Sequence, residues 1–137
     1  MTPSPVSLQD HGSIRRITVD RPDKLNALNA ATLDALLAAF EQAAEDPAVR
    51  VVVLTGAGPK AFVAGADIAE MAALRPVEGR DFSLRGQRLM RRIETLPKPV
   101  IDEVIDAVST QPGTLVSLAR LKNHDDYTFM HSAAVCA

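Results

Sequence analysis

The apolar positions of the first hundred residues follow two periods, one typical of strands and one typical of helices. Residues 13–20, SIRRITVD, are rich in β-branched side chains that partly alternate, which predicts a strand. Residues 30–45 carry apolar side chains three and four positions apart behind Asn29, a residue type that caps helix N-termini, so they predict a helix. The apolar face of that helix would consist of Leu33, Leu36, Leu37, Phe40 and Ala44.

The alternation of strands and helices continues beyond this helix. Residues 49–54, VRVVVL, form a short β-branched run that predicts a buried strand of a parallel sheet. A short helix is predicted over 67–74 and a longer one over 76–96, and TLPKPVI then indicates a turn that leads into another strand. This order is that of an α/β protein, and we expect two or three parallel strands in residues 1–101.

The pattern changes at a boundary that we place near residues 101–102. Residues 102–137 contain three short stretches with apolar side chains at helical spacing and no strand pattern, so an all-α tail is expected. The stretch DEVIDAVS, which begins at Asp102, predicts the first of these helices. We therefore expect two parts, an α/β unit over 1–101 and a helical tail over 102–137.

Composition excludes several classes of function. Of the 137 residues, 47% are hydrophobic and 23% are charged, which is ordinary for one modest soluble domain. The net charge of −2 gives no electrostatic reason to expect a nucleic-acid or anionic-membrane partner. No apolar run reaches the roughly 18–20 residues that span a bilayer, and the N-terminus MTPSPVSLQD has no signal-peptide pattern. A single cysteine, Cys136, excludes an internal disulfide, so we expect a cytoplasmic protein.

The stretch 61–71, AFVAGADIAEM, places small residues and a glycine between a predicted strand and a predicted helix. Small residues let a ligand approach the backbone closely, and unpaired N–H groups there can stabilise negative charge on an oxygen. Judged by its local residues alone, this stretch is better explained as a tight turn that uses small side chains for packing.

A neighbouring stretch offers a different interpretation. Residues 56–61, GAGPKA, match the G-x-G-x-x-A pattern of dinucleotide-binding turns. In such turns the helix begins within the glycine loop. Here Pro59 and the following Val63-Ala64-Gly65-Ala66 come before any predicted helix, which argues against a dinucleotide site.

The wider pattern of residues 11–101 resembles the crotonase superfamily, the enoyl-CoA hydratases and isomerases. Four motifs, RPDKLNAL, VVLTGAG, FVAGADI and LPKPVI, occur in the order and spacing of that family. The resemblance implies a crotonase-like α/β fold and an acyl-CoA thioester as the binding partner. Coenzyme A is then part of the substrate, and no separate cofactor is implied.

The resemblance also implies which residues form the site. The family polarises the thioester carbonyl with two backbone N–H groups, and the N–H of Ala66 would be the first of them. The residues implied to lie along CoA are Ala64, Gly65, Ala66, Asp67 and Ile68. The resemblance implies that a second wall of the CoA channel is formed by Lys24, Leu25, Ala27 and Leu28, with Lys24 near the CoA phosphates. Without the resemblance, Lys24 would be interpreted as a solvated lysine in a turn.

The second half of the family pattern has no counterpart in this sequence. After KPVI the family continues with a strand, a glycine-rich loop that supplies the second oxyanion donor, and catalytic glutamates. Hydration of an enoyl thioester needs such carboxylates to move the protons of water. Solvated helix faces account for Glu41, Glu45, Glu70, Glu78 and Glu94, none of which matches those positions. We therefore expect a truncated homologue that binds acyl-CoA and is catalytically impaired.

The tail resembles a different family. Residues 117–137, SLARLKNHDDYTFMHSAAVCA, are similar to the start of HD-GYP domains, which are metal-dependent phosphodiesterases of cyclic di-GMP. The similarity implies His131 as a vestigial metal ligand only, because one imidazole cannot hold a catalytic metal ion. A fragment of such a phosphodiesterase is therefore an alternative function.

A third hypothesis is a non-catalytic interaction protein. Half of a crotonase sheet would leave an open edge strand, which invites self-association. Two incomplete families in one chain are compatible with a fused or decayed gene, a misassembled frame or a deliberate chimera. We favour a decayed or misjoined frame, because neither family keeps its catalytic half.

Overall fold

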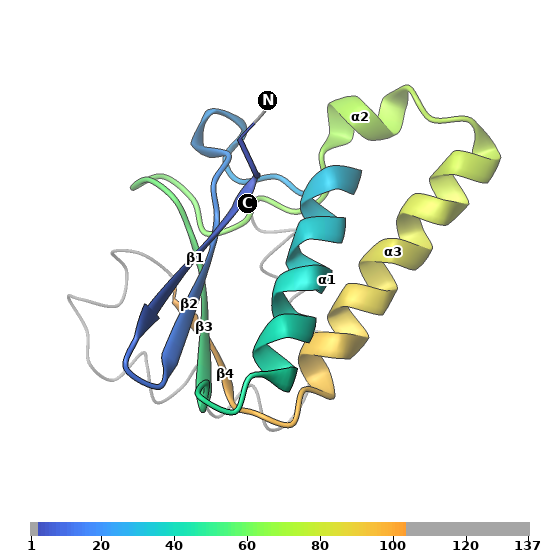
Figure 1. Cartoon of the computed structure of the whole chain (residues 1–137). Coiled ribbons are helices and arrows are strands. Elements are labelled where there is room, and N and C mark those ends of the chain that lie inside the picture. Colours follow the sequence, from blue (N-terminus) through green and yellow to red (C-terminus); the bar gives the residue numbers. More distant parts are fainter. Residues whose placement is uncertain (1–2, 104–137) are drawn as a thin grey trace, which may run out of the picture.

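The computed structural model of the chain describes residues 3–103, which contain a four-stranded sheet with helices on one face (Figure 1). The strands are β1 (Val6–His11), β2 (Ile14–Val19), β3 (Val51–Gly56) and β4 (Val100–Glu103), and they lie in this order across the sheet. The first pair is antiparallel, whereas β2, β3 and β4 are parallel to one another. The α/β prediction is therefore confirmed.

Helix α1 (Ala30–Glu45) follows β2 and has the bounds that the apolar pattern predicts. The Asn29 side chain accepts hydrogen bonds from the Thr32 N–H at 2.9 Å and from the Thr32 hydroxyl at 2.6 Å. This cap satisfies one of the N–H groups that a helix start leaves unpaired. Most of the predicted apolar face is buried, with Leu37 and Ala44 only partly so.

Two helices connect β3 to β4. Helix α2 (Ile68–Ala72) is short, and α3 (Pro76–Glu94) is long and lies beside α1 on the same face of the sheet (Figure 1). Ion pairs join the two long helices, with the Arg85 guanidinium 2.9 Å from Asp34 and the Arg92 guanidinium 2.7 Å from Glu41. The core is aliphatic apart from two phenylalanines. Its buried members are Val6, Ile17, Val19, Leu28, Leu33, Leu36, Ala39, Phe40, Ala43, Val49, Val52, Leu54, Phe82, Leu89, Leu96 and Val100.

Lys98 ties the approach to β4 to the end of α1. Its ammonium nitrogen lies 2.6 Å from the Ala43 carbonyl oxygen and 2.5 Å from the Asp46 carbonyl oxygen. The last carbonyls of a helix have no partner within the helix, and a lysine near them also complements the helix dipole. The PKP turn of the sequence is thus fixed to α1 by one side chain.

Two features of the sheet differ from the sequence-based expectation. Strand β1 was not expected, because Pro3 and Pro5 precede it and its side chains are exposed after Val6. The helix expected from Asp102 onward is wrong at its first two residues, since Asp102 and Glu103 belong to β4 and continue the parallel register with β3. The remainder of the predicted helical tail, including His131, lies outside the described residues.

Two further expectations, on membrane-spanning segments and on an open sheet edge, can be compared with residues 3–103. None of the helices within residues 3–103 is long and apolar enough to cross a membrane. Among these residues β1 pairs with β2 alone, so one of its edges is open. Self-association through an open edge stays a prediction.

Candidate functional site

Two segments that are distant in the sequence lie side by side at the site, and three backbone hydrogen bonds join them. The Ala64 N–H donates to the Leu25 carbonyl over 3.1 Å. The Leu28 N–H donates to the Gly65 carbonyl over 2.7 Å, and the Asp67 N–H donates to the Leu28 carbonyl over 2.8 Å. The two walls that the family resemblance implies therefore form one short parallel pairing.

The direction of the Ala66 backbone follows from this pairing. Leu28 and Ala66 form an isolated parallel bridge in which Leu28 uses both of its backbone groups. The partners of Leu28 are the residues on either side of Ala66, so the Ala66 N–H and carbonyl point away from Leu28. Ala66 is exposed, and within residues 3–103 its N–H donates to no acceptor. Gly65 makes the bend at φ +91°, a conformation that glycine adopts without a steric penalty.

A largely buried ion pair supports the same pairing. The Arg21 guanidinium donates to the Ala27 carbonyl and, over 3.0 Å, to the Asp67 carboxylate. The other oxygen of Asp67 caps α2 by accepting from the Glu70 N–H over 3.2 Å. The Arg21 guanidinium, and then the Glu70 N–H, hold the pKa of the Asp67 carboxyl below its usual value. Asp67 is therefore a structural carboxylate that stays ionised.

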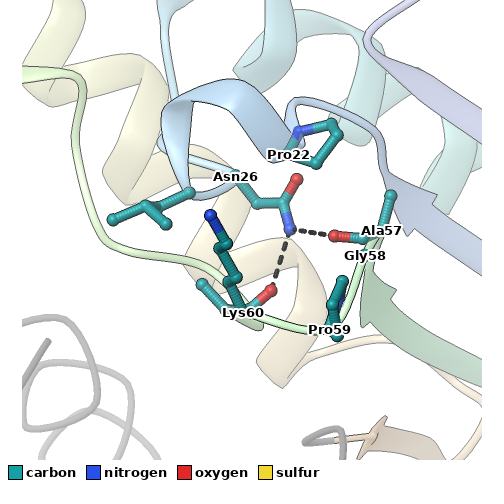
Figure 2. Close-up of a pocket in the computed structure, with 8 residues that line it drawn as sticks. Pro22, Asn26, Ala57, Gly58, Pro59 and Lys60 are labelled. Atoms are coloured by element: carbon teal, nitrogen blue, oxygen red, sulfur yellow. Dashed lines mark hydrogen bonds between the residues drawn. The ribbon is translucent and has the colours of Figure 1, made fainter.

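Asn26 fixes the turn that precedes this pairing. Its side chain is fully buried, accepts from the Arg21 N–H over 2.9 Å, and donates to the Ala57 and Ala61 carbonyls over 2.9 and 2.8 Å (Figure 2). Its φ of +57° lies in the left-handed region, which asparagine tolerates better than most residues. One side chain thus joins the 21–26 turn to the loop that follows β3.

Gly56 allows that loop to cross close to the end of β3. A Cβ atom there would lie 1.9 Å from the Phe62 carbonyl oxygen and 2.7 Å from the Asn26 amide nitrogen. The glycine is required by a backbone crossing and not by a bound pyrophosphate. Helix α2 also begins only at Ile68, so the loop does not open directly into a helix as a dinucleotide-binding turn does.

A shallow pocket of about 170 Å³ lies between the turn and the loop (Figure 2). Its lining residues are Pro22, Leu25, Asn26, Ala57, Gly58, Pro59, Lys60 and Ala61. Lys60 extends across this space toward the turn (Figure 2). Lys24 does not line the pocket, but it ends the short helix η1 (Pro22–Lys24), whose first residue does. Both lysines are exposed, and neither has an ion-pair partner in the part of the chain described. Lys60 at the pocket, with Lys24 in the adjoining turn, suits an anionic ligand.

The structure brings all the implied site residues into one region, but their roles differ. The Leu28 side chain packs in the core, so it is not available for direct contact with a ligand. Asp67 is occupied by Arg21, whereas Ile68 is 79% exposed beside Ala66. Ala27 contributes the carbonyl that Arg21 binds, and Leu25 lines the pocket with a backbone in the left-handed region, at φ 52°.

Three residues of the site were not singled out from the sequence. Arg21 and Asn26 belong to the RPDKLNAL motif, but their partners outside it, Asp67 for Arg21 and Ala57 and Ala61 for Asn26, are 31 to 46 positions away, and no local pattern predicts such contacts. The sequence pattern marks Lys60 only as part of a glycine loop. Within residues 3–103 no group of three or more histidine, cysteine or acidic side chains is placed to hold a metal ion.

Comparisons with known proteins agree with this geometry. The sequence model of the family described as enoyl-CoA hydratase/isomerase matches residues 9–118, and so runs past the boundary placed at 101–102. A short-chain-enoyl-CoA hydratase of Clostridium acetobutylicum is 46% identical over 99 residues, which cover 72% of this chain and 38% of the relative. A crotonyl-CoA hydratase of Syntrophomonas wolfei is 41% identical with the same coverage. The chain thus spans well under half the length of these relatives.

Solved structures show the same fold. The enoyl-CoA hydratase of Bacillus anthracis superposes with a TM-score of 0.71 at 35% identity, over 73% of this chain and 39% of that protein. The enoyl-CoA hydratase of Thermoplasma volcanium gives the same TM-score and identity over 76% of this chain and 41% of that protein. The matched sequence, the parallel sheet and the paired segments around Ala66 lead to one conclusion. The chain belongs to the enoyl-CoA hydratase/isomerase family.

Proposed function

We propose that the chain binds acyl-CoA thioesters, with the Ala66 N–H donating a hydrogen bond to the thioester carbonyl oxygen. The observation that carries this proposal is the exposed Ala66 N–H, which the Leu28 bridge turns outward and leaves without an acceptor in residues 3–103. A fixed N–H of this kind stabilises negative charge that develops on an oxygen. The relatives named as enoyl-CoA and crotonyl-CoA hydratases support a thioester as the ligand.

The nucleotide end of CoA would occupy the pocket beside Lys60. Segment 61–66 leads from that pocket to Ala66 and spans at most roughly 17 Å when extended. Lys24 and Lys60 would face the phosphates, since both are cationic and lack a carboxylate partner within the described residues. Coenzyme A is in this proposal a part of the ligand and not a separate cofactor.

Catalysis of hydration is expected to be weak or absent in the described part of the chain. Hydration needs a carboxylate that can take a proton from water. The two carboxylates nearest Ala66 in sequence are engaged elsewhere. Asp67 binds Arg21 and caps α2, and Glu70 accepts a hydrogen bond from the Ala30 N–H over 3.3 Å. The proposal is therefore binding with polarisation of the carbonyl, without efficient addition of water.

A pair of matched ligands tests the proposal. Isothermal titration of the whole chain with acetyl-CoA and with S-ethyl-CoA compares a thioester with a thioether that lacks the carbonyl oxygen. We expect both to bind, and acetyl-CoA to bind more tightly by about three- to tenfold, the value of one hydrogen bond. Absence of binding by either ligand would refute the proposed function. Equal affinities would refute the role of Ala66.

The catalytic part of the proposal has a separate test. Crotonyl-CoA is mixed with the purified chain, and the loss of enoyl absorbance is followed, with a full-length hydratase of the family as the reference. We expect turnover lower by at least about a hundredfold, since general acid–base catalysis by a free carboxylate contributes an effect of that order. Turnover comparable with the reference would show that the chain contains a complete catalytic centre.

A further inference from the structure

Arg21 contacts both of the segments that form the site, through its side chain and its backbone. Its side chain is only 16% exposed, and its guanidinium binds the Ala27 carbonyl and the Asp67 carboxylate together. Its backbone carbonyl also accepts from the N–H groups of Lys24 and Asn26, both over 2.9 Å. Arg21 therefore lies at the centre of the turn and reaches across to the opposite wall.

The two partners of the guanidinium flank the bridge that orients Ala66. Ala27 directly precedes Leu28 on one wall, and Asp67 directly follows Ala66 on the other. Arg21 thus adds a side-chain connection beside the backbone hydrogen bonds of Leu28. Without it, the Ala66 peptide would be held by the backbone hydrogen bonds between the two segments alone, and the Asp67 carboxylate would keep only its contact with the start of α2.

The chemistry of the contact favours arginine specifically. A guanidinium is planar and presents several N–H groups in a fixed fork, so it can bind a carbonyl and a carboxylate at once in a defined geometry. A lysine ammonium is a point charge on a flexible stem and orients its partners less strictly. Within residues 3–103, Arg21 is also the one cation that pairs with Asp67.

We infer that Arg21 is a positioning residue for the oxyanion donor. By joining Ala27 to Asp67 across the Leu28–Ala66 bridge, its guanidinium fixes the direction in which the Ala66 N–H points. The inference rests on the proposed function, because a fixed direction matters only if the N–H binds the thioester oxygen. Small displacements of a donor from its productive geometry cause large losses of stabilisation.

The test uses an acyl-CoA that reports polarisation of its own carbonyl. In 4-dimethylaminocinnamoyl-CoA an electron donor is conjugated to the thioester, so a hydrogen bond to the carbonyl oxygen shifts its absorption to longer wavelength. The whole chain is compared with Arg21→Met and Arg21→Lys, each at saturating protein so that all ligand is bound. Arg92→Met is the matched control, because Arg92 makes a similar two-pronged pair with Glu41, between α1 and α3.

We expect the wild type and Arg92→Met to give the full red shift. Arg21→Met should still bind, with a Kd raised by about tenfold or less, and lose most of the shift. Arg21→Lys should recover part of it. Because the shift is measured on bound ligand at saturation, a partly unfolded variant does not mimic the effect. A full red shift in Arg21→Met would overturn the inference and leave the proposed function intact, whereas absence of binding by the wild type would overturn both.

Discussion

The contacts of Asn26 allow a quantitative prediction about how the site is held together. Replacement by alanine removes the acceptor of the Arg21 N–H and the donor to two loop carbonyls, three partly buried contacts made by a fully buried side chain. It also places a side chain with no local hydrogen-bonding ability at φ +57°. Replacement by glycine removes the same hydrogen bonds but suits this backbone conformation.

The expected magnitudes follow from these two differences. Three hydrogen bonds with net values of about 0.5–1.5 kcal/mol each predict a loss of roughly 2–4 kcal/mol for Asn26→Gly. Asn26→Ala should lose about 1–2 kcal/mol more, the cost of a left-handed conformation for a residue with a Cβ atom. A domain of this size is stable by about 5–15 kcal/mol, so the alanine variant should lose a large share of its stability.

Urea unfolding followed by far-ultraviolet circular dichroism measures both losses, because the sequence has no tryptophan and one tyrosine and gives little intrinsic fluorescence. Gln42→Ala is the matched control, since it removes an exposed amide from α1 and should change the free energy of unfolding by less than about 0.5 kcal/mol. A loss for Asn26→Ala as small as that of the control would show that the turn and the loop do not depend on this side chain. A loss for Asn26→Gly larger than for Asn26→Ala would contradict the role assigned to the backbone conformation.

Three further predictions concern other contacts of the fold. Gly56→Ala should destabilise by about 3 kcal/mol or more in urea unfolding, because its Cβ meets a loop carbonyl, whereas Gly79→Ala in α3 meets nothing within 4 Å and should stabilise slightly. Lys98→Met should lower the free energy of unfolding by about 1–3 kcal/mol, since it removes the donor to two carbonyls at the end of α1; an unchanged urea midpoint would contradict this. Arg21 lowers the pKa of Asp67, so the resulting stabilisation is present above the unfolded pKa of about 3.9 and is lost as pH falls. The stability difference between wild type and Asp67→Asn should therefore be constant from about pH 8 to about pH 5 and shrink in acid, and a change near pH 7 would contradict the assignment.

The long helices could be predicted from the sequence because their signals are local. Helix α1 has an N-cap at Asn29, a regular apolar stripe and a stop at Asp46-Pro47, and each of these signals can be identified within a few residues. The strands β2 and β3 were located to within two residues for the same reason, since β-branched runs mark buried strands. Strand β1 was missed because an exposed edge strand carries no comparable apolar pattern.

The junction after Val100 shows why a local pattern can mislead. DEVIDAVS has the spacing of an amphipathic helix, yet its first two residues continue β4 beside Leu54 and Thr55. Parallel pairing is a contact between segments far apart in the chain, and it overrides a short propensity signal. The same reason explains why the contacts of Arg21 with Asp67 and of Asn26 with Ala57 were not predicted, because these partners lie beyond any local window.

The contacts that support the proposed Ala66 donor lie in a short part of the chain, so the proposed binding can be tested separately from catalysis. The Leu28 bridge, the Arg21 guanidinium and the Asn26 side chain all lie between β2 and α2, with every partner within residues 21–67. These contacts can therefore preorganise one donor without any residue that follows α2. One fixed donor can bind and polarise a carbonyl, whereas addition of water also needs a free carboxylate to move its protons. Substitutions at Arg21 should thus alter the polarisation of bound ligand, even in a chain that catalyses no hydration.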